Sequence, residues 1–510
     1  MTLYRGFATV GGMTVISRLL GFVRDILIAA VLGASAISDA FFVALRVPNM
    51  FRRFFAEGAF NMAFVPMFSK RLERDGDAKA FAESALSGLA TVLIVLTLVA
   101  QLAMPWLILA LASGFAGQEQ FGLSVEFGRI AFPYVLFISL AALLSGVLNA
   151  TGRFAAAAAA PVLLNVLLVG SMAIAAALGG DVARALIWTI PVAGIAQLAL
   201  VWIAASRAGF SLKPVRPRLS PEMRRLVRVA IPAALAGGVV QVNLLVGQQV
   251  ASYFEKAVGW LYAADRLYQL PLGVVGIAIG VVLLPDLSRR LAASDDAGGR
   301  AALSRAAEVS LALTIPAAVA LVVIPEPLVS VLFERGATTS QDILSIAQAV
   351  AIYGLGLSAF VMQKILQPLF FAREDTRSPF RYAVVAMVLN AVVALGLAPL
   401  IGWLAPAVAT TLAGWAMVWL LWRGARPMGE VARFDQRFHT RIWRICVAAL
   451  VMGAALWLAA WGFRDALHTD WLRYIALAGL VALGGVVFFG FGQAIGAVRL
   501  SEFRRALKRT

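Results

Sequence analysis

Long apolar segments alternate with short polar ones along almost the whole chain. A helix needs about 20 mostly apolar residues to cross a bilayer. Only a turn at Gly402-Trp403-Leu404 separates the eleventh such segment from the twelfth. The pattern predicts an all-α membrane protein with about fourteen transmembrane helices, at residues 7–32, 37–69, 80–112, 122–150, 155–179, 183–206, 225–253, 258–287, 303–333, 341–371, 380–402, 404–422, 442–462 and 471–497.

The overall composition supports this interpretation. Of the 510 residues, 61% are hydrophobic and 14% are charged, whereas soluble domains have about 45–50% apolar and about 25% charged residues. The formal net charge of +17 would suggest nucleic acid as a partner of a soluble protein. Membrane proteins, however, concentrate lysine and arginine in cytoplasmic loops, so no nucleic-acid partner is expected.

The distribution of basic residues between the loops predicts the orientation of the chain. With the N-terminus inside, the predicted cytoplasmic segments hold 31 lysines and arginines and the outer loops hold 5. Such a bias is typical of cytoplasmic loops. We therefore expect both termini in the cytoplasm and an even number of spans.

Two sequence patterns recur at corresponding places and predict an internal repeat. The pattern P-x-[FL]-S-[KR]-R-L occurs at residues 66–72 and 285–291, each time at the inner end of the second helix of its half. Asn165 and Asn390 each lie in the fifth helix. Equal orientation indicates parallel repeats related by an axis along the membrane normal. The predicted organisation is an N-lobe of six helices (1–212), a cytoplasmic linker (213–224), a C-lobe of six helices (225–424), two C-terminal helices (440–498) and a basic cytoplasmic tail (499–510).

Charged residues within the predicted spans are the best candidates for a functional site. They are costly in hydrocarbon, so they usually face a cavity and mark a substrate path. We also expect a break or kink at Pro48-Asn49, which membrane proteins tolerate beside a cavity. The basic residues outnumber the acidic ones, so an electropositive cleft with an anionic ligand is predicted. The set is Arg18, Arg24, Asp25, Asp39, Arg46, Arg52, Arg53, Glu57, Asp265, Arg266, Glu326 and Lys364.

Arginine suits a phosphate ligand because its planar fork binds phosphate through two parallel hydrogen bonds and keeps its charge when desolvated. The alternative is that each arginine pairs with a nearby acid as part of the packing, for example Arg24 with Asp25 or Asp39. Cys446, His439 and His468 form no metal or haem motif, and no P-loop is present. We expect no cofactor, no metal and no enzymatic activity.

Several motifs resemble those of a known family, the MurJ (MviN) lipid II flippases of the multidrug/oligosaccharidyl-lipid/polysaccharide exporter superfamily. They are S-R-L-L-G-F-V-R-D at 17–25, D-A-F-F-V-A-L-R-V-P-N-M-F-R-R at 39–53, E-G-A-F at 57–60, F-V-P at 64–66, and A-D-R at 264–266 through L-P at 284–285. The resemblance covers about residues 1–500. One departure is Gln269, where an acidic residue is common in the family.

The resemblance implies fourteen helices, two six-helix lobes and a groove for a lipid tail formed by the last two helices. It also implies that an inner-membrane protein moves undecaprenyl-pyrophosphate-linked disaccharide-pentapeptide from the cytoplasmic to the periplasmic leaflet. The family's cavity arginines correspond to Arg18, Arg24, Arg52 and Arg266. Supporting or gating roles are expected for Asp25, Asp39, Asn49, Arg53, Glu57, Asp265 and Lys364.

We expect alternating access by a monomer, with the head group in the cleft and the polyprenyl tail in lipid or the groove. The sequence does not choose among membrane potential, an ion gradient and downstream consumption as the drive. Two alternatives stay open: export of other oligosaccharide-lipids or drugs, and a scaffold without transport. Single changes of the cavity arginines separate a transporter from a scaffold, because lipid II translocation that is retained after these changes would favour the scaffold.

The charge distribution leads to a test of topology. Reporter fusions after residues 75, 215 and 435 are expected to report a cytoplasmic location, and fusions after 117, 255 and 467 a periplasmic one, because 31 basic residues lie in the predicted inner segments against 5 outside. A periplasmic signal at 215 would contradict the repeat as well as the orientation.

Overall fold

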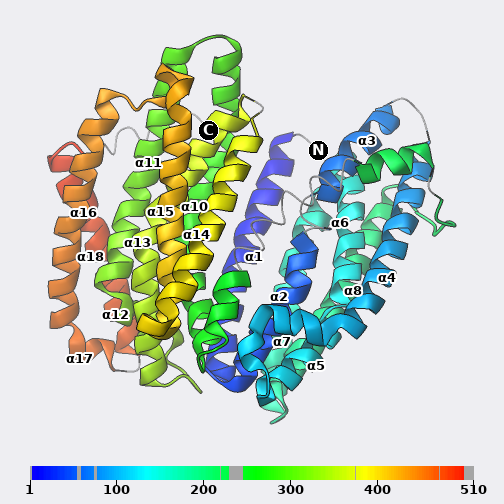
Figure 1. Ribbon diagram of the computed structural model, residues 1–510, viewed down its shortest axis with the longest axis horizontal. Helices are drawn as coiled ribbons and strands as arrows, with labels where there is room; N and C mark the ends of the chain where they lie inside the picture. Colours follow the sequence, from blue (N-terminus) through cyan, green and yellow to red (C-terminus); the bar gives the residue numbers. More distant parts are fainter. Residues whose placement is uncertain are drawn as a thin grey trace. The chain divides into compact units, whose positions relative to one another are not determined.

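The computed structural model describes residues 3–53, 55, 59–73, 77–218, 220–228, 245–373, 375–469 and 471–498 (Figure 1). Within these ranges the chain is helical and contains no strand. It divides into two compact units, of which the first comprises Met1–Gly259 with Arg335–Ala337, and the second Trp260–Glu334 with Thr338–Thr510. The predicted lobe boundaries, with the linker at 213–224, stay a prediction.

The first unit is a set of long helices with short connections. Helices α1 and α7 pack together, α2 packs on α5, and both α6 and α7 pack on α8. Large phenylalanine side chains, such as Phe41, Phe64 and Phe127, fill the interior. The helices are α1 (Leu3–Leu32), α2 (Ala36–Arg52), α3 (Ala59–Glu73), α4 (Ala78–Ala112), η2 (Ser113–Phe115), α5 (Glu119–Ala131), α6 (Tyr134–Ala150), α7 (Ala155–Ala177) and α8 (Val182–Arg207).

The second unit repeats part of this packing order. Helices α13 and α14 both pack on α15, as α6 and α7 pack on α8, and α11 packs on α13 and α16. Helix α10 begins three residues before the unit does. The helices are α10 (Ala257–Ala292), α11 (Asp296–Val323), α12 (Pro325–Phe333), α13 (Ser340–Phe371), α14 (Arg377–Ile401), η3 (Gly402–Leu404), α15 (Ala405–Ala425), η4 (Arg426–Met428), η5 (Glu430–Ala432), α16 (Gln436–Gly462), α17 (Arg464–Leu467) and α18 (Leu472–Ala494).

The prediction of an all-α membrane protein is confirmed. Among the described residues, nine helical segments are long and apolar enough to cross a membrane, and one of these covers both α14 and α15. The predicted turn between spans eleven and twelve is the short helix η3, which begins at Gly402 with a φ of +61°. The count of fourteen spans stays a prediction, and most of span 225–253 lies outside the described residues.

Three predicted spans each contain two helices instead of one. The segment 122–150 is interrupted between α5 and α6 at Phe132-Pro133, and 303–333 is interrupted between α11 and α12 just before Pro325. Proline lacks the amide hydrogen and disfavours helix at the residue before it, which explains both interruptions. The segment 37–69 contains α2 and α3.

Of the break or kink expected at Pro48-Asn49, the break does not occur. Helix α2 continues through Pro48 as far as Arg52, and residues 53 and 55 then adopt π-helical geometry. Proline is tolerated inside membrane helices where neighbouring groups satisfy the backbone that it frees. This π-helical geometry widens the helical turn that follows Arg52, and such turns are common near functional sites.

Helix α16 packs on α11 through a small residue. Gly453 of α16 lies so close to α11 that an added Cβ atom would come 2.7 Å from Cγ1 of Val319. Ile445, Ala448 and Ala449 of the same helix are fully buried in the surrounding apolar cluster. A small side chain at position 453 therefore sets how closely α16 approaches α11.

We expect Gly453→Leu to lower the thermal unfolding midpoint of the purified protein in detergent. Forcing extra methylenes into a packed helix contact costs about 1–3 kcal/mol. Gly479→Leu in α18 is the matched control, because a Cβ atom there meets nothing within 4 Å. Equal midpoints for the two variants would contradict the packing described here. The midpoint is followed through intrinsic tryptophan fluorescence.

Candidate functional site

The candidate site in the first unit is built around Arg24 of α1. Its Nε and Nη2 atoms donate to Oδ1 of Asp25 at 3.0 and 2.7 Å. The side chain of Arg24 is 18% exposed and that of Asp25 is 5% exposed. The pairing of Arg24 with Asp25, which the sequence offered as an alternative, is therefore present. A nearly buried carboxylate compensates part of this arginine's charge.

Asn165 of α7 fixes the same arginine from the other side. Its Oδ1 accepts a hydrogen bond from Nη1 of Arg24 at 2.9 Å, and its Nδ2 donates to the carbonyl oxygen of Ser17 at 2.9 Å. Asn165 is buried. The amide thus bridges two turns of α1 and orients the Arg24 guanidinium. The sequence marked Asn165 only as a repeat partner of Asn390, so this role was missed.

The other predicted residues of the first unit have different surroundings. Arg18 is exposed on α1, and Asn49 and Arg53 are exposed at the end of α2. Arg52 is half-buried as the last residue of α2, and its neighbour Phe51 packs edge-on against Phe132 with ring centroids 5.2 Å apart. The predicted Glu57 lies outside the described residues.

Asp39 lies at the other end of α2 and has a structural partner. Its side chain is in the first turn of α2, is buried, and accepts a hydrogen bond from the amide of Gly259 at 2.8 Å. A Cβ atom at Gly259 would lie 3.2 Å from the same carboxylate oxygen. Asp39 therefore ties the start of α2 to the start of α10, and it makes this contact far from Arg52.

A second contact also joins segments of the two sequence halves within the first unit. The amide of Ala337 donates to the carbonyl oxygen of Ala30 at 3.0 Å. Gly33 and Gly336 both have a φ of +59°, and a Cβ atom on either would overlap backbone of the opposing segment. Only glycine fits both the conformation and the close approach.

The third contact lies at the end of α4. Ser113 and Gly114 bond to the segment 249–253: the amide of Ser113 donates to Oε1 of Gln249 at 3.0 Å, and that of Gly114 donates to Oγ of Ser252 at 3.1 Å. By the predicted topology, all three contacts lie at the periplasmic ends of their helices.

The second unit contains Asp265, Arg266 and Lys364. The guanidinium of Arg266 lies over the ring of Tyr262, with its carbon 4.5 Å from the ring centroid. Asp265 accepts a hydrogen bond from Nε2 of Gln269. Lys364 is exposed on α13. Tyr262 was missed, although its spacing of four residues from Arg266 was a usable signal.

An apolar groove lies among α11, α12, α16 and α18. Its volume is about 230 Å³, and its lining includes Pro316, Leu328, Met452, Leu480 and Phe488. Helices α16 and α18, the orange to red ribbons of Figure 1, lie side by side. The groove is large enough for part of an apolar chain.

No metal site is formed within the described ranges, because no three His, Cys, Asp or Glu side chains gather there. Cys446 carries a free thiol on α16.

Comparison with known proteins identifies the family. The family model described as "Lipid II flippase MurJ" matches residues 28–481. The chain belongs to this family. It is 44% identical to a "Probable lipid II flippase MurJ" of Rhizobium meliloti (strain 1021), over 100% of this chain and 97% of that protein. It is 34% identical to the "Lipid II flippase MurJ" of Burkholderia cenocepacia, over the full length of both.

Solved structures share the fold. The structure of "Lipid II flippase MurJ, inward closed conformation" has a TM-score of 0.79 at 23% identity and covers 98% of this chain and 99% of that one. An inward-facing multidrug resistance MATE family transporter of the MOP superfamily has a TM-score of 0.69 at 14% identity, covering 81% of this chain and 95% of that one. Membership of the family shows that the chain is a transporter and not an enzyme, and that it is a multi-pass protein of the inner membrane.

The bridge made by Asn165 can be tested in cells. We expect Asn165→Ala to lower transport about tenfold, because it removes a charge-assisted hydrogen bond that orients Arg24. Growth complementation, with the protein level checked in the membrane fraction, measures the effect. Asn149→Ala, at an exposed position of α6, is the control. Full complementation by Asn165→Ala at normal protein level would show that the bridge is dispensable.

Proposed function

We propose that the chain translocates lipid II, the undecaprenyl-pyrophosphate-linked disaccharide-pentapeptide, from the cytoplasmic to the periplasmic leaflet. Membership of the family and the full-length similarity to proteins named lipid II flippases support this proposal. The proposed partners are lipid II and membrane lipids, and the proposed functional form is a monomer with both termini in the cytoplasm.

The pyrophosphate is held in this proposal by Arg18, Arg24, Arg52 and Arg266. The observation that carries it is the anchoring of Arg24 by Asp25 and Asn165. A guanidinium held from two sides is pre-oriented, so less rotamer freedom is lost when phosphate binds. The cation–π contact of Arg266 with Tyr262 has the same effect in the second unit. The remaining supporting residues would tune the position and charge of these four.

The undecaprenyl tail would lie along the apolar groove among α11, α12, α16 and α18. Its described lining is apolar, with side chains such as Leu328, Met452 and Phe488. Such a surface suits an isoprenoid chain, which cannot enter a charged cleft. The groove holds only part of the chain, and the rest would stay in lipid.

Alternating access requires contacts that close one side and then separate. The contacts of Asp39 with Gly259, of Ala30 with Ala337, and of Ser113 with Gln249 are suited to this role, because each joins an early segment to a later one through few hydrogen bonds, at most four of them at Ser113 and Gly114. We propose that they close the periplasmic side and break when the cleft opens outward. A few bonds at three points can be exchanged for water at small net cost.

The decisive experiment replaces Arg18, Arg24, Arg52 or Arg266 singly by lysine and by alanine. If the site needs a bidentate fork, lysine fails nearly as badly as alanine, because ammonium is a point charge. We expect lysine to fail at two or more of the four positions. Losing one charge-assisted bond weakens head-group binding by about ten- to a hundredfold.

Growth complementation measures the outcome, and lipid II accumulation by leaflet after depletion of the protein links growth to transport. Arg207, exposed at the end of α8, provides an alanine control for loss of charge alone. Normal growth of all four alanine variants at wild-type protein level would exclude the proposed phosphate site.

A further inference from the structure

A row of polar contacts joins α11 to the segment that leads into α16. Arg300, Ser304 and Glu308 follow one another at intervals of four residues and so share one face of α11. Nη1 of Arg300 donates to Oε2 of Glu430 at 2.7 Å, and the amide of Asp435 donates to Oγ of Ser304 at 3.0 Å. These bonds fix where α16 begins against α11.

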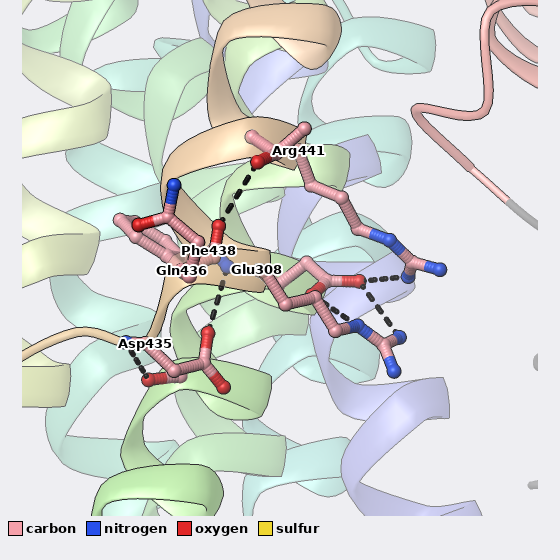
Figure 2. A network of polar contacts seen from close by, with 8 residues as sticks. Glu308, Asp435, Gln436, Phe438 and Arg441 are labelled. Carbon is pink, nitrogen blue, oxygen red and sulfur yellow. Dashed lines mark hydrogen bonds and ion pairs between the residues drawn. The ribbon is translucent and has the colours of Figure 1, made fainter.

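The last contact of the row is an ion cluster at Glu308. Its carboxylate accepts hydrogen bonds from Nε and Nη2 of Arg437, at 3.2 and 3.3 Å, and from Nη1 of Arg441. Figure 2 shows the side chains of Glu308 and Arg441 directed toward each other. The Glu308 and Arg441 side chains are only 8% and 9% exposed, whereas that of Arg437 is 32% exposed. One carboxylate therefore serves two guanidiniums.

The basic character of α16 goes beyond this pair. Arg437, Arg441 and Arg444 are spaced by four and three residues, which puts them on one face of the helix. Helix α16 contains no acidic residue between Gln436 and Gly462. Arg444 is exposed and its neighbour Trp443 is 71% exposed. Exposed tryptophan next to arginine is typical of the level of lipid head groups, so this arginine face lies where lipid phosphates lie.

The arginine face is adjacent to the apolar groove. Ala312, which lines the groove, follows Glu308 by four residues, a rise of about 6 Å along α11. A prenyl chain is joined directly to its phosphate, so its first carbons would reach the groove from a phosphate held at Arg437. A glycerophospholipid instead has glycerol and two ester-linked chains at this place. The geometry favours the prenyl compound.

We propose that Arg437 and Arg441 form a docking site for the pyrophosphate of a polyprenyl-linked substrate at the predicted cytoplasmic end of the groove. Glu308 is a positioning residue that holds both guanidiniums side by side. The substrate docks here while its head group is still outside the central arginines. This inference rests on the proposed function and adds a second, earlier phosphate site to it.

If the cluster had only a structural role, lipid II binding would not depend on Arg437. Arg441 alone keeps Glu308 paired, so Arg437→Gln leaves the buried ion pair intact while it removes one phosphate ligand. Arg433→Gln is the matched control: Arg433 lies on the same segment, is 68% exposed, and pairs with Glu430 instead of Glu308. Both variants lose one positive charge, so only the position differs.

The test uses the full chain in proteoliposomes. The initial rate of lipid II translocation is measured against the lipid II content of the membrane, and binding is measured by cross-linking to a photoreactive polyprenyl pyrophosphate. We expect Arg437→Gln to raise the half-saturating lipid II content about tenfold, with the maximal rate unchanged, and to reduce cross-linking to α16. Arg433→Gln is expected to behave as wild type.

Each alternative outcome has one meaning. Equal half-saturation for Arg437→Gln and Arg433→Gln overturns the docking site. Competition by phosphatidylglycerol as strong as that by unlabelled polyprenyl pyrophosphate also overturns it, in favour of a general anionic-lipid site. Absence of lipid II translocation by the wild-type protein overturns the proposed function instead. If Arg437→Gln does not fold, Arg437→Lys against Arg433→Lys provides the same comparison, with loss of the fork at constant charge.

Discussion

The free-energy cost of charge in a membrane determines how this protein is built. An ionised side chain within a spanning helix is costly unless a cavity, water or a partner compensates it. Helices α1 and α10 carry such charges: Arg18, Arg24 and Asp25 lie in α1, and Asp265 and Arg266 lie in α10. They depend on local compensation, by Asp25 and Asn165 around Arg24 and by Tyr262 under Arg266.

Hydrophobic pattern and charge predicted the class of protein and most helices, because lipid imposes a simple length and polarity rule on each span. The failures have local causes. Pro133 and Pro325 divide spans that hydropathy joins, whereas Pro48 does not end α2. Proline has the same chemistry at all three places, and only the neighbouring groups decide whether the freed backbone is satisfied.

Residue types at the candidate site were predictable, but their partners were not. Arginine inside a span is visible in any sequence, and Arg24 with Asp25 is a neighbouring pair. Asn165, in contrast, is 141 positions from Arg24, and Gly259 is 220 positions from Asp39. Such contacts follow from how the helices pack. The donor at Gly259 is a backbone amide, which almost every residue type has, so the sequence could not show that this residue bonds to Asp39. The repeat of Asn165 and Asn390 in the sequence indicated that this position matters, but it did not predict the hydrogen bond of Asn165 to Arg24.

The pairing of Arg24 with Asp25 also gives Arg24 and Arg18 different electrostatic roles. Its guanidinium makes two bonds to one oxygen of Asp25, so part of its charge is already compensated before any substrate arrives. Arg18 is exposed on the same helix and has no acidic neighbour within six residues in the sequence. Attraction of a pyrophosphate would then come chiefly from Arg18, while Arg24 supplies a fixed direction for hydrogen bonds. At Glu308 the ratio differs, because one carboxylate accepts hydrogen bonds from two guanidiniums. In the proposed mechanism, Arg24 therefore orients an anion, whereas Arg18 and the two guanidiniums at Glu308 attract it.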